Sequence, residues 1–295
     1  MSRLRRPHRL AGIALAAASS VLALQAAAPA SAVAPGPGTL RRPSPIAAAR
    51  AAGVEPGNAT MGWPADRSPA LASDSAGKVS AKAFVPSGVL GIDVSSHQGR
   101  VNWSTYARQG KRFAYVKATE GTYYKNPYFR SQYTGSSDAG LIRGAYHFAN
   151  PRRSSGKAQA TYFVRNGGGW TADGRTLPGV LDIEYNPYAG GTCYGLTKKQ
   201  MVAWVASFLA EYKRRTSRDA VIYTTTDWWT RCTGNSTRFS ATNPLWAARY
   251  GTRTPGTLPG GWRWATFWQY SSIPIDQNRF SSSYNRLVVL ATKAS

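Results

Sequence analysis

The sequence predicts an α/β protein whose core is a single modified β/α barrel with its later helices lost. From residue 88 onward, short apolar runs of strand length alternate with segments of helical periodicity, as expected for repeated β/α units. After Trp229 the strand-like runs continue, but no long helical pattern separates them. The roughly 208 residues after position 87 are enough for one sizeable core, so we predict one folded domain.

The elements follow from turn signals, apolar runs and helix-start residues. The predicted strands span residues 89–94, 113–118, 142–148, 180–185, 220–224, 245–249, 265–270 and 286–291. The predicted helices span residues 102–109, 127–139, 155–165 and 197–215. Pro127 suits the first position of its helix, and the dipeptide Pro178-Gly179 marks the turn before strand 180–185.

The helix at 197–215 has the clearest pattern. Thr197 and Gln200 form a capping-box sequence at its start, and three basic residues favour its carboxyl end. Its apolar face consists of Met201, Trp204, Val205, Phe208, Leu209 and Tyr212. We interpret this stripe as core packing, not as a cofactor site.

Three segments differ in composition. Residues 1–32 combine four arginines, an Ala/Leu-rich apolar stretch and the cleavage-type sequence Ala30-Ser31-Ala32, which indicate a secretory signal peptide. Residues 33–87 are rich in Ala, Pro, Gly and Ser, so we expect a disordered linker or pro-segment. Residues 88–295 form the predicted barrel domain. No other stretch is apolar enough to span a bilayer, and we expect a secreted, extracellular monomer.

The chain is strongly basic, with a formal net charge of +24. Residues 88–295 hold 27 basic and ten acidic residues, or +17, so most of the charge belongs to the predicted domain. This excess implies an anionic partner, which leaves an acidic cell wall, a membrane surface or nucleic acid as candidates.

The chain has only two cysteines, Cys193 and Cys232. In an exported protein a disulfide between them is the default expectation. The sequence contains no CxxC pair and no Cys/His metal pattern, so we predict neither a metal nor a cofactor.

Two acids in the strand at 180–185 are the first candidates for chemistry. Asp182 and Glu184 lie two residues apart, so on a strand their side chains point to the same face. Each carboxylate disfavours ionisation of the other, so one pKa is expected to rise and the other to fall. A glycosidase needs this divergence, because one group must donate a proton and the other must stabilise positive charge on the sugar.

Other acids follow neighbouring strands. Asp93 closes the first strand, Glu120 follows the second, and Asp276 lies in a late loop. In a barrel the carboxyl ends of the strands converge on one face, where catalytic residues gather. The remaining acids of the domain fit helix or loop surfaces.

Aromatic side chains near the same strand ends are candidates for stacking against sugar rings. They are Tyr123, Tyr124, Tyr146, Tyr185, Tyr188, Tyr223, Trp246, Trp268 and Tyr270. Core packing explains about half of such a set. His97 and His147 are expected to be hydrogen-bonding supports, because no third ligand is spaced to join them around a metal.

Six motifs, in order, resemble glycoside hydrolase family 25, the lysozymes that cleave the β-1,4 bond after N-acetylmuramic acid in peptidoglycan. The motifs are Asp93-Val94-Ser95-Ser96-His97-Gln98, Lys117-Ala118-Thr119-Glu120-Gly121, Gly144-Ala145-Tyr146-His147-Phe148, Leu181-Asp182-Ile183-Glu184, Leu245-Trp246-Ala247-Ala248-Arg249-Tyr250 and Trp268-Gln269-Tyr270. The resemblance covers about residues 88–295 and implies a modified barrel of eight strands and about five helices.

The resemblance also implies residue roles. Glu184 would be the general acid, Asp182 its partner, and Asp93 and Asp276 would complete an acidic floor. The implied substrate contacts are Glu120, Tyr146, Tyr223, Trp246, Arg249 and Gln269. The implied partners are bacterial peptidoglycan and anionic cell-wall polymers rather than nucleic acid. We expect acetamido-assisted hydrolysis with retention, while direct water attack with inversion stays open.

Three other functions remain to be weighed. A chitinase-like glycosidase also places Asp-x-Glu on a fourth barrel strand, but it usually has a further acid where this chain has Val180. A non-catalytic wall-binding module would be expected to lose Asp182 or Glu184, and both are present. A basic nuclease would need a phosphate-binding loop, which the sequence does not contain.

Overall fold

The computed structural model describes residues 44–59, 61–62 and 85–294 of the 295-residue chain. The predicted signal peptide at 1–32 lies outside the described residues. The described part of the chain contains no helix that is long and apolar enough to cross a membrane.

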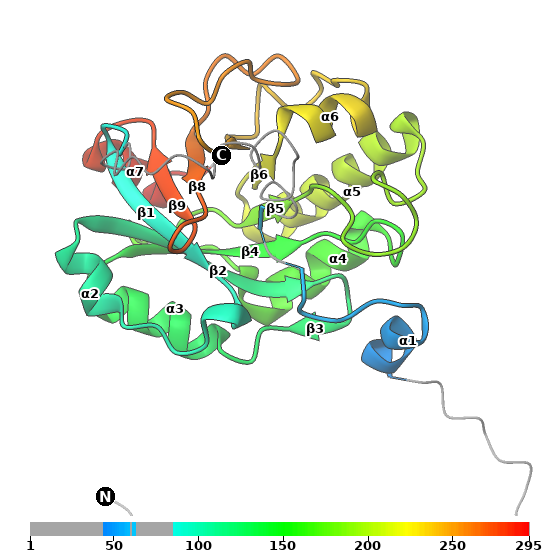
Figure 1. Cartoon of the computed structure of the whole chain (residues 1–295), viewed down its shortest axis with the longest axis horizontal. Helices are drawn as coiled ribbons and strands as arrows, with labels where there is room; N and C mark the ends of the chain where they lie inside the picture. The colour runs from blue at the N-terminus through cyan, green and yellow to red at the C-terminus, as the bar shows by residue number, and fades with distance from the viewer. Residues whose placement is uncertain (1–43, 60, 63–84, 295) are drawn as a thin grey trace, which may run out of the picture. The chain divides into compact units, whose positions relative to one another are not determined.

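Eight strands form a closed barrel. They are β1 (Val89–Val94), β2 (Lys111–Glu120), β4 (Ile142–Phe148), β5 (Val180–Asp182), β6 (Val221–Thr224), β7 (Leu245–Ala248), β8 (Phe267–Ser271) and β9 (Gln277–Phe280). Around the ring their order is β1-β9-β8-β7-β6-β5-β4-β2, and β2 pairs again with β1. The short strand β3 (Tyr124–Lys125) pairs with β2 outside the ring. The predicted eight-stranded barrel is therefore confirmed (Figure 1).

The barrel is mixed, not wholly parallel. Strand β9 runs antiparallel to both of its neighbours, β1 and β8, and closes the ring between them. The other neighbouring strands of the ring pair in parallel. No strand is predicted at residues 277–280, because these residues are mostly polar and form no apolar run.

The helices are α1 (Pro45–Ala51), α2 (Trp103–Arg108), α3 (Phe129–Asp138), α4 (Gly156–Phe163), α5 (Lys198–Thr216), α6 (Thr226–Thr233) and α7 (Tyr284–Thr292), with short turns η2 (Ser96–Gln98) and η3 (Val164–Gly168). The connections β7–β8 and β8–β9 contain no helix, as predicted. The described residues hold seven α-helices instead of about five, because α1 precedes the barrel and α7 follows its last strand.

The predicted strand at 286–291 is wrong, since these residues lie within helix α7. A short apolar run rich in Val and Leu does not distinguish a strand from a buried helix by periodicity alone. The start signal was present in Ser283, whose side chain accepts a hydrogen bond from the Arg286 backbone N–H.

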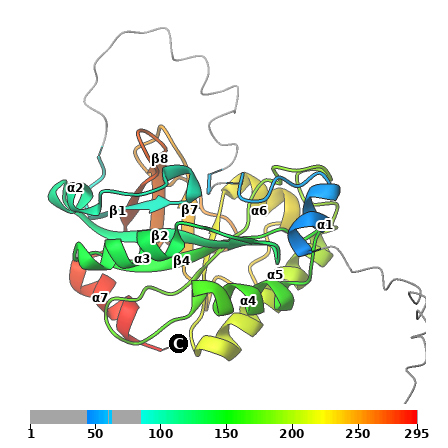
Figure 2. The ribbon, with the colours of Figure 1, turned by 90° about the horizontal axis from the view of Figure 1, so that it is seen from below.

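Apolar side chains fill the inside of the barrel and the layer between the barrel and its helices. The interior holds tightly packed aromatic rings, including Tyr115, Trp246 and Phe267. Outside, α5 packs along α4 through the predicted stripe that contains Trp204 and Phe208, and Thr197 forms the predicted capping box. Figure 2 shows α3, α4 and α7 on one side of the strands.

An N-terminal segment, defined here as residues 44–59 and 61–62, is ordered against the barrel domain. It begins with α1, which Ser44 caps, and Ala49 and Val54 are buried against Tyr123 near β3. The predicted disorder of residues 33–87 is therefore wrong for this segment. The segment's own composition gives little periodicity, and its order comes from contacts with the domain (Figure 1).

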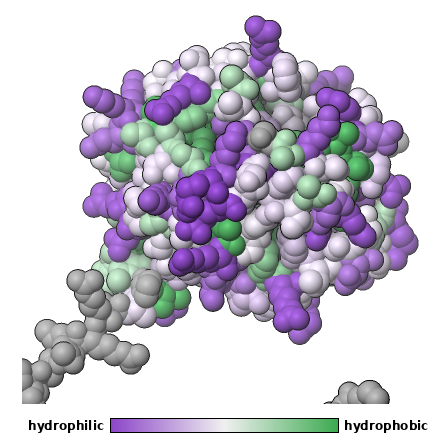
Figure 3. Space-filling model, turned by 180° about the vertical axis from the view of Figure 1, so that it is seen from behind, coloured by the Kyte–Doolittle hydropathy of each residue, from purple (hydrophilic) through white to green (hydrophobic). Residues whose placement is uncertain are grey.

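The domain face opposite to that of Figure 1 carries many strongly hydrophilic residues among residues of intermediate hydropathy, with hydrophobic residues in scattered groups (Figure 3). This agrees with the large excess of basic residues in the sequence after position 87.

Candidate active site

The barrel brings the predicted acids to one end. Asp93 lies on β1, Glu120 ends β2 and Asp182 ends β5, and these strands have their carboxyl ends at the same rim. Asp276 directly precedes β9. Because β9 is antiparallel to its neighbours, its amino end lies at the rim where the other strands end. The strand that the sequence analysis missed therefore explains how a late residue reaches the site.

Asp182 and Glu184, the acid pair, lie at the end of β5 on this rim. Strand β5 ends at Asp182 instead of continuing to residue 185, but the Ile183 backbone N–H still donates to the Tyr223 carbonyl, 3.1 Å away. Burial raises the pKa of Asp182 well above its ordinary value. The positive charge of Lys117 and a hydrogen bond with Glu184 oppose this rise. The surroundings of the pair therefore determine whether Asp182 holds a proton.

Asp93 is held by two amide side chains. Gln269 Nε2 donates to Asp93 Oδ1 over 2.9 Å, and Asn278 Nδ2 donates to the same oxygen over 2.6 Å. Burial raises the pKa of Asp93 to about 6, while these two hydrogen bonds and one with Asp276 work to lower it. Asp93 is therefore a buried acid whose pKa lies well above its ordinary range.

The orientation of Gln269 is fixed by two tyrosines. Tyr223 and Tyr250 both donate their hydroxyl hydrogens to Gln269 Oε1, at 2.6 and 2.5 Å. The amide oxygen is thus an acceptor for both, so its Nε2 faces Asp93 as a donor. Tyr223 therefore acts on Asp93 through Gln269.

Trp246 has a similar supporting place. It is fully buried among the aromatic rings of the barrel interior, and its indole N–H donates to Asn278 Oδ1 over 3.1 Å. This contact turns the Asn278 amide nitrogen toward Asp93. The tryptophan expected to contact substrate thus reaches the acids through Asn278.

Tyr146 and Arg249 differ in burial. Tyr146, on β4, is buried, and its hydroxyl hydrogen-bonds the backbone of Met61 in the N-terminal segment. Burial raises its pKa well above the ordinary value, and the nearby charges of Asp93, Asp182 and Asp276 add to the rise. Arg249 is exposed and packs against Gly256 in the connection from β7 to β8.

Lys117 is a site residue to which the sequence analysis assigned no role. It is fully buried on β2, and its ammonium group pairs with Glu120 Oε2 over 2.7 Å. It also lies 5.2 Å from the Phe148 ring centroid and lowers the pKa of Asp182. A lysine inside the apolar strand 113–118 was the available signal, because an unpaired ammonium is costly to bury.

Glu120 accepts further hydrogen bonds from two tyrosines that the sequence placed near the strand ends. Tyr123 and Tyr188 both donate to its Oε1, over 2.8 and 2.5 Å. His147 supports β4 as expected, with Nδ1 paired to Thr119 and Nε2 to Gln159. Burial lowers the pKa of His147 to about 3. Among the described residues, no group of three or more His, Cys, Asp or Glu is arranged to hold a metal ion.

The predicted disulfide between Cys193 and Cys232 is confirmed, with Cα atoms 5.3 Å apart. It joins the loop after the acid pair to helix α6. Because Tyr188 lies in that loop, the disulfide restrains a segment whose hydroxyl contacts Glu120.

Sequence comparison identifies relatives of this chain. The family model of glycosyl hydrolases family 25 matches residues 92–278. Lysozyme M1 of Streptomyces globisporus is 52% identical over 217 residues, which cover 71% of this chain and 73% of that protein. The N,O-diacetylmuramidase of Chalaropsis sp is 46% identical over 210 residues, which cover 69% of this chain and 99% of that protein.

Solved structures agree with the sequence comparison. A muramidase from Acremonium alcalophilum is 54% identical with a TM-score of 0.67, and the match covers 69% of this chain and 99% of that chain. A bacterial lysozyme from Streptomyces coelicolor is 52% identical with a TM-score of 0.69, and the match covers 71% of this chain and 99% of that chain. On its barrel, its acids and these matches, this chain belongs to glycosyl hydrolases family 25.

Proposed function

We propose that this chain is a secreted lysozyme that hydrolyses the β-1,4 bond between N-acetylmuramic acid and N-acetylglucosamine in bacterial peptidoglycan. The observation that carries the proposal is the acid pair, Asp182 and Glu184, at the rim where the parallel strands end. The lysozyme and muramidase names of relatives about half identical to this chain support the same activity.

In the proposed reaction Glu184 is the general acid. It donates a proton to the glycosidic oxygen as the bond from that oxygen to the anomeric carbon breaks. Asp182, beside it, then acts as a carboxylate. The Lys117 charge favours this ionised form, and burial opposes it. Entry of substrate and water into the site therefore changes the protonation of Asp182.

Asp182 has a second proposed role toward the substrate's 2-acetamido group. It accepts a hydrogen bond from the acetamido N–H, while the acetamido carbonyl oxygen forms a bond to the anomeric carbon. Water then attacks the anomeric carbon and breaks its new bond to the acetamido oxygen, while Glu184, now a carboxylate, accepts a proton from that water. The product keeps the β configuration, and no covalent bond to the enzyme is formed.

Asp93 and Asp276 are proposed to complete the acidic floor. Hydrogen bonds from Gln269 and Asn278 fix the orientation of Asp93 before substrate binds. Were water to attack the anomeric carbon directly, one of these two acids would serve as its general base and the configuration would invert. We propose Glu120, Tyr146 and Arg249 as direct substrate contacts, with Tyr223, Trp246 and Gln269 supporting Asp93.

Two readings of the products test the proposal. Mass spectrometry of fragments from purified peptidoglycan should find muramic acid at the new reducing ends, and N-acetylglucosamine there would contradict it. Proton NMR of the first-formed product should find the β anomer. An α anomer appearing first would exclude the acetamido route and assign the general base to Asp93 or Asp276.

We further infer that the protein works outside the cell as a monomer on walls with anionic polymers. The Cys193–Cys232 disulfide is typical of an oxidising compartment. The basic excess after position 87 favours adsorption to an acidic wall.

A further inference from the structure

The acids of the site are covered by the chain itself. The side chains of Asp182, Glu184 and Glu120 are 0% exposed, although a polysaccharide must reach them. Gly62 of the N-terminal segment lies directly on the pair, and its backbone N–H donates to Glu184 Oε1 over 2.7 Å. One carboxyl oxygen of the proposed general acid therefore has a peptide N–H as its neighbour.

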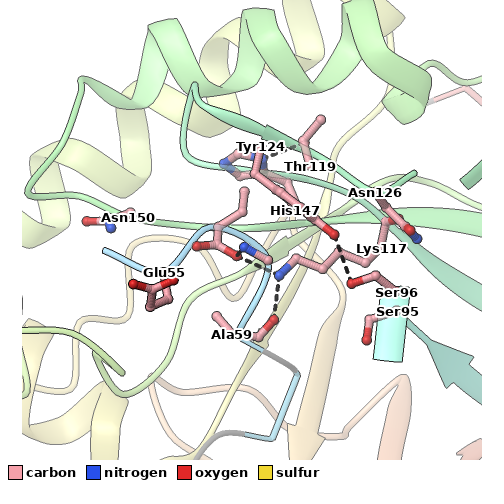
Figure 4. A network of polar contacts seen from close by, with 12 residues as sticks. Glu55, Ala59, Ser95, Ser96, Lys117, Thr119, Tyr124, Asn126, His147 and Asn150 are labelled. Atoms are coloured by element: carbon pink, nitrogen blue, oxygen red, sulfur yellow. Dashed lines mark hydrogen bonds and ion pairs between the residues drawn. The ribbon is translucent and has the colours of Figure 1, made fainter. Parts of the chain in front are cut away.

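Main-chain atoms of the segment bind the domain at several points along the site. The Gly57 N–H donates to Glu120 Oε2 over 3.3 Å, and the Ala59 carbonyl accepts from Lys117. Figure 4 shows Ala59 and Lys117 joined in this way. Further out, the Glu55 carbonyl accepts from the Tyr188 hydroxyl over 3.1 Å. The Arg153 side chain donates to the Ala48 carbonyl over 3.1 Å. The segment thus occupies hydrogen-bonding groups that a sugar would need.

Apolar side chains anchor the segment at both ends. Ala49 and Val54 are buried against Tyr123 beside the rim. At the other end Met61 is only 2% exposed and joins the apolar cluster of the barrel, which includes Tyr146 and Trp246. Burial of these side chains favours the docked state, because each removes apolar surface from water.

Two glycines set how closely the segment approaches. Gly62 has a φ of +89°, and a Cβ there would lie 2.1 Å from the Tyr250 hydroxyl. Gly57 also has a φ of +89°, and a Cβ there would lie 2.5 Å from the Tyr124 ring. Any larger residue would be strained and would clash, so glycine permits the close fit at both positions.

We propose that the N-terminal segment is an inhibitory pro-segment that binds over the acid pair and keeps the hydrolase inactive until cleavage of the chain separates the segment from the barrel domain. This inference rests on the proposed function, since it takes Glu184 as the working acid. A cut would turn an intramolecular contact into an intermolecular one, and dilution would then release the segment. Lys117 and Glu120 would become available to sugar hydroxyls at the same moment.

The test uses the full chain with a recognition sequence for a specific protease inserted between residues 63 and 84. Reducing ends released from purified peptidoglycan are measured before cutting and after removal of the freed peptide. We expect the rate to rise about tenfold or more, because at least two buried hydrogen bonds hold the segment on the site. A synthetic peptide of residues 44–62 should then slow the cut enzyme again. Equal rates for cut and uncut enzyme would overturn the proposal.

Two matched glycine variants of the uncut chain distinguish the effect of releasing the segment from the effect of backbone strain. Gly62→Asn should release the segment and raise the rate. Gly53→Asn should leave it unchanged, because Gly53 also has a positive φ of +72° but no atom lies within 4 Å of its Cβ position. Asn is used because it tolerates this conformation better than other side chains. If Gly62→Asn hydrolyses peptidoglycan at the same rate as the uncut parent chain, the proposal is contradicted.

Hydrogen exchange gives a readout independent of catalysis. Amides of residues 57 and 62 should be protected in the uncut chain and in Gly53→Asn, and should exchange freely in Gly62→Asn. Free exchange in the uncut parent chain would refute docking. If docking is observed but the cut enzyme releases no sugar, the proposed function fails while the segment's binding stands.

Discussion

At the scale of single residues, the site depends on neighbours that fix each acid. Asp93 illustrates this, because two amides donate to one of its oxygens and each amide is oriented by other side chains. The types of the acids and their strand positions were predictable from the sequence. The orienting contacts were not, since they join residues far apart in the chain, such as Asp93 and Asn278.

The raised pKa of Asp93 predicts how stability varies with pH. Its ordinary value is 3.8 and its value in the folded chain is about 6, so between these values the folded state holds a proton that the unfolded state has lost. Stability should therefore fall as pH rises through this window, by on the order of 3 kcal/mol. Asp93→Asn keeps an acceptor for Gln269 and Asn278 but cannot ionise, so it should remove this fall.

Urea unfolding of the full chain and of Asp93→Asn at pH 4 and pH 7 checks this. We expect the variant to gain stability relative to the parent at the higher pH while losing activity. An identical pH dependence in the two proteins would show that Asp93 does not titrate in this window.

At the scale of elements, most of the barrel could be predicted from periodicity, and the errors of that prediction have physical causes. Strands β1 and β4 and the cap of α5 agree with the predicted limits, because apolar runs and capping boxes are local signals. Strand β9 was missed because its buried Asn278 is satisfied by Asp93 and Trp246 instead of by apolar packing. Helix α7 was mistaken for a strand because its run is short and β-branched.

The disulfide joins two elements that border the site, and its removal should loosen both. It closes a loop with a sequence separation of 39 residues. Replacing Cys193 and Cys232 together by Ser should lower the free energy of unfolding by about 3–4 kcal/mol. Denaturant unfolding measures this loss, and thiol titration of the unreduced parent should find no free thiol. An unchanged unfolding midpoint would contradict the prediction.

At the scale of the whole molecule, the N-terminal segment is the feature that composition predicted least well. Its helix is short, and its contacts over the site come from backbone N–H and carbonyl groups. Side-chain patterns do not record such contacts, so a sequence of Ala, Pro and Gly resembles a linker even where it docks. The sequence left a linker and a pro-segment open as alternatives, and it did not indicate where the segment binds.

The charge of the molecule predicts a salt effect on wall binding. The net +17 after position 87 acts on an anionic polymer largely through exposed side chains, which salt screens. Adsorption to purified walls should weaken steeply between low and near-molar salt, and lysis should weaken with it. Walls stripped of their anionic polymers provide the control and should show a smaller effect. Binding that is insensitive to salt would show that charge does not hold the enzyme to its substrate.

The most direct test of the account is the activity of Glu184→Gln after the N-terminal segment has been cut and removed. Gln keeps the shape of the side chain but has no acidic proton, so hydrolysis of peptidoglycan should fall by about 10²–10⁴-fold while wall binding is retained. Asp138→Asn, at an exposed acid on α3, is the matched control and should keep full activity. Activity of Glu184→Gln within a few-fold of the cut parent enzyme would contradict the assignment of Glu184 as the general acid.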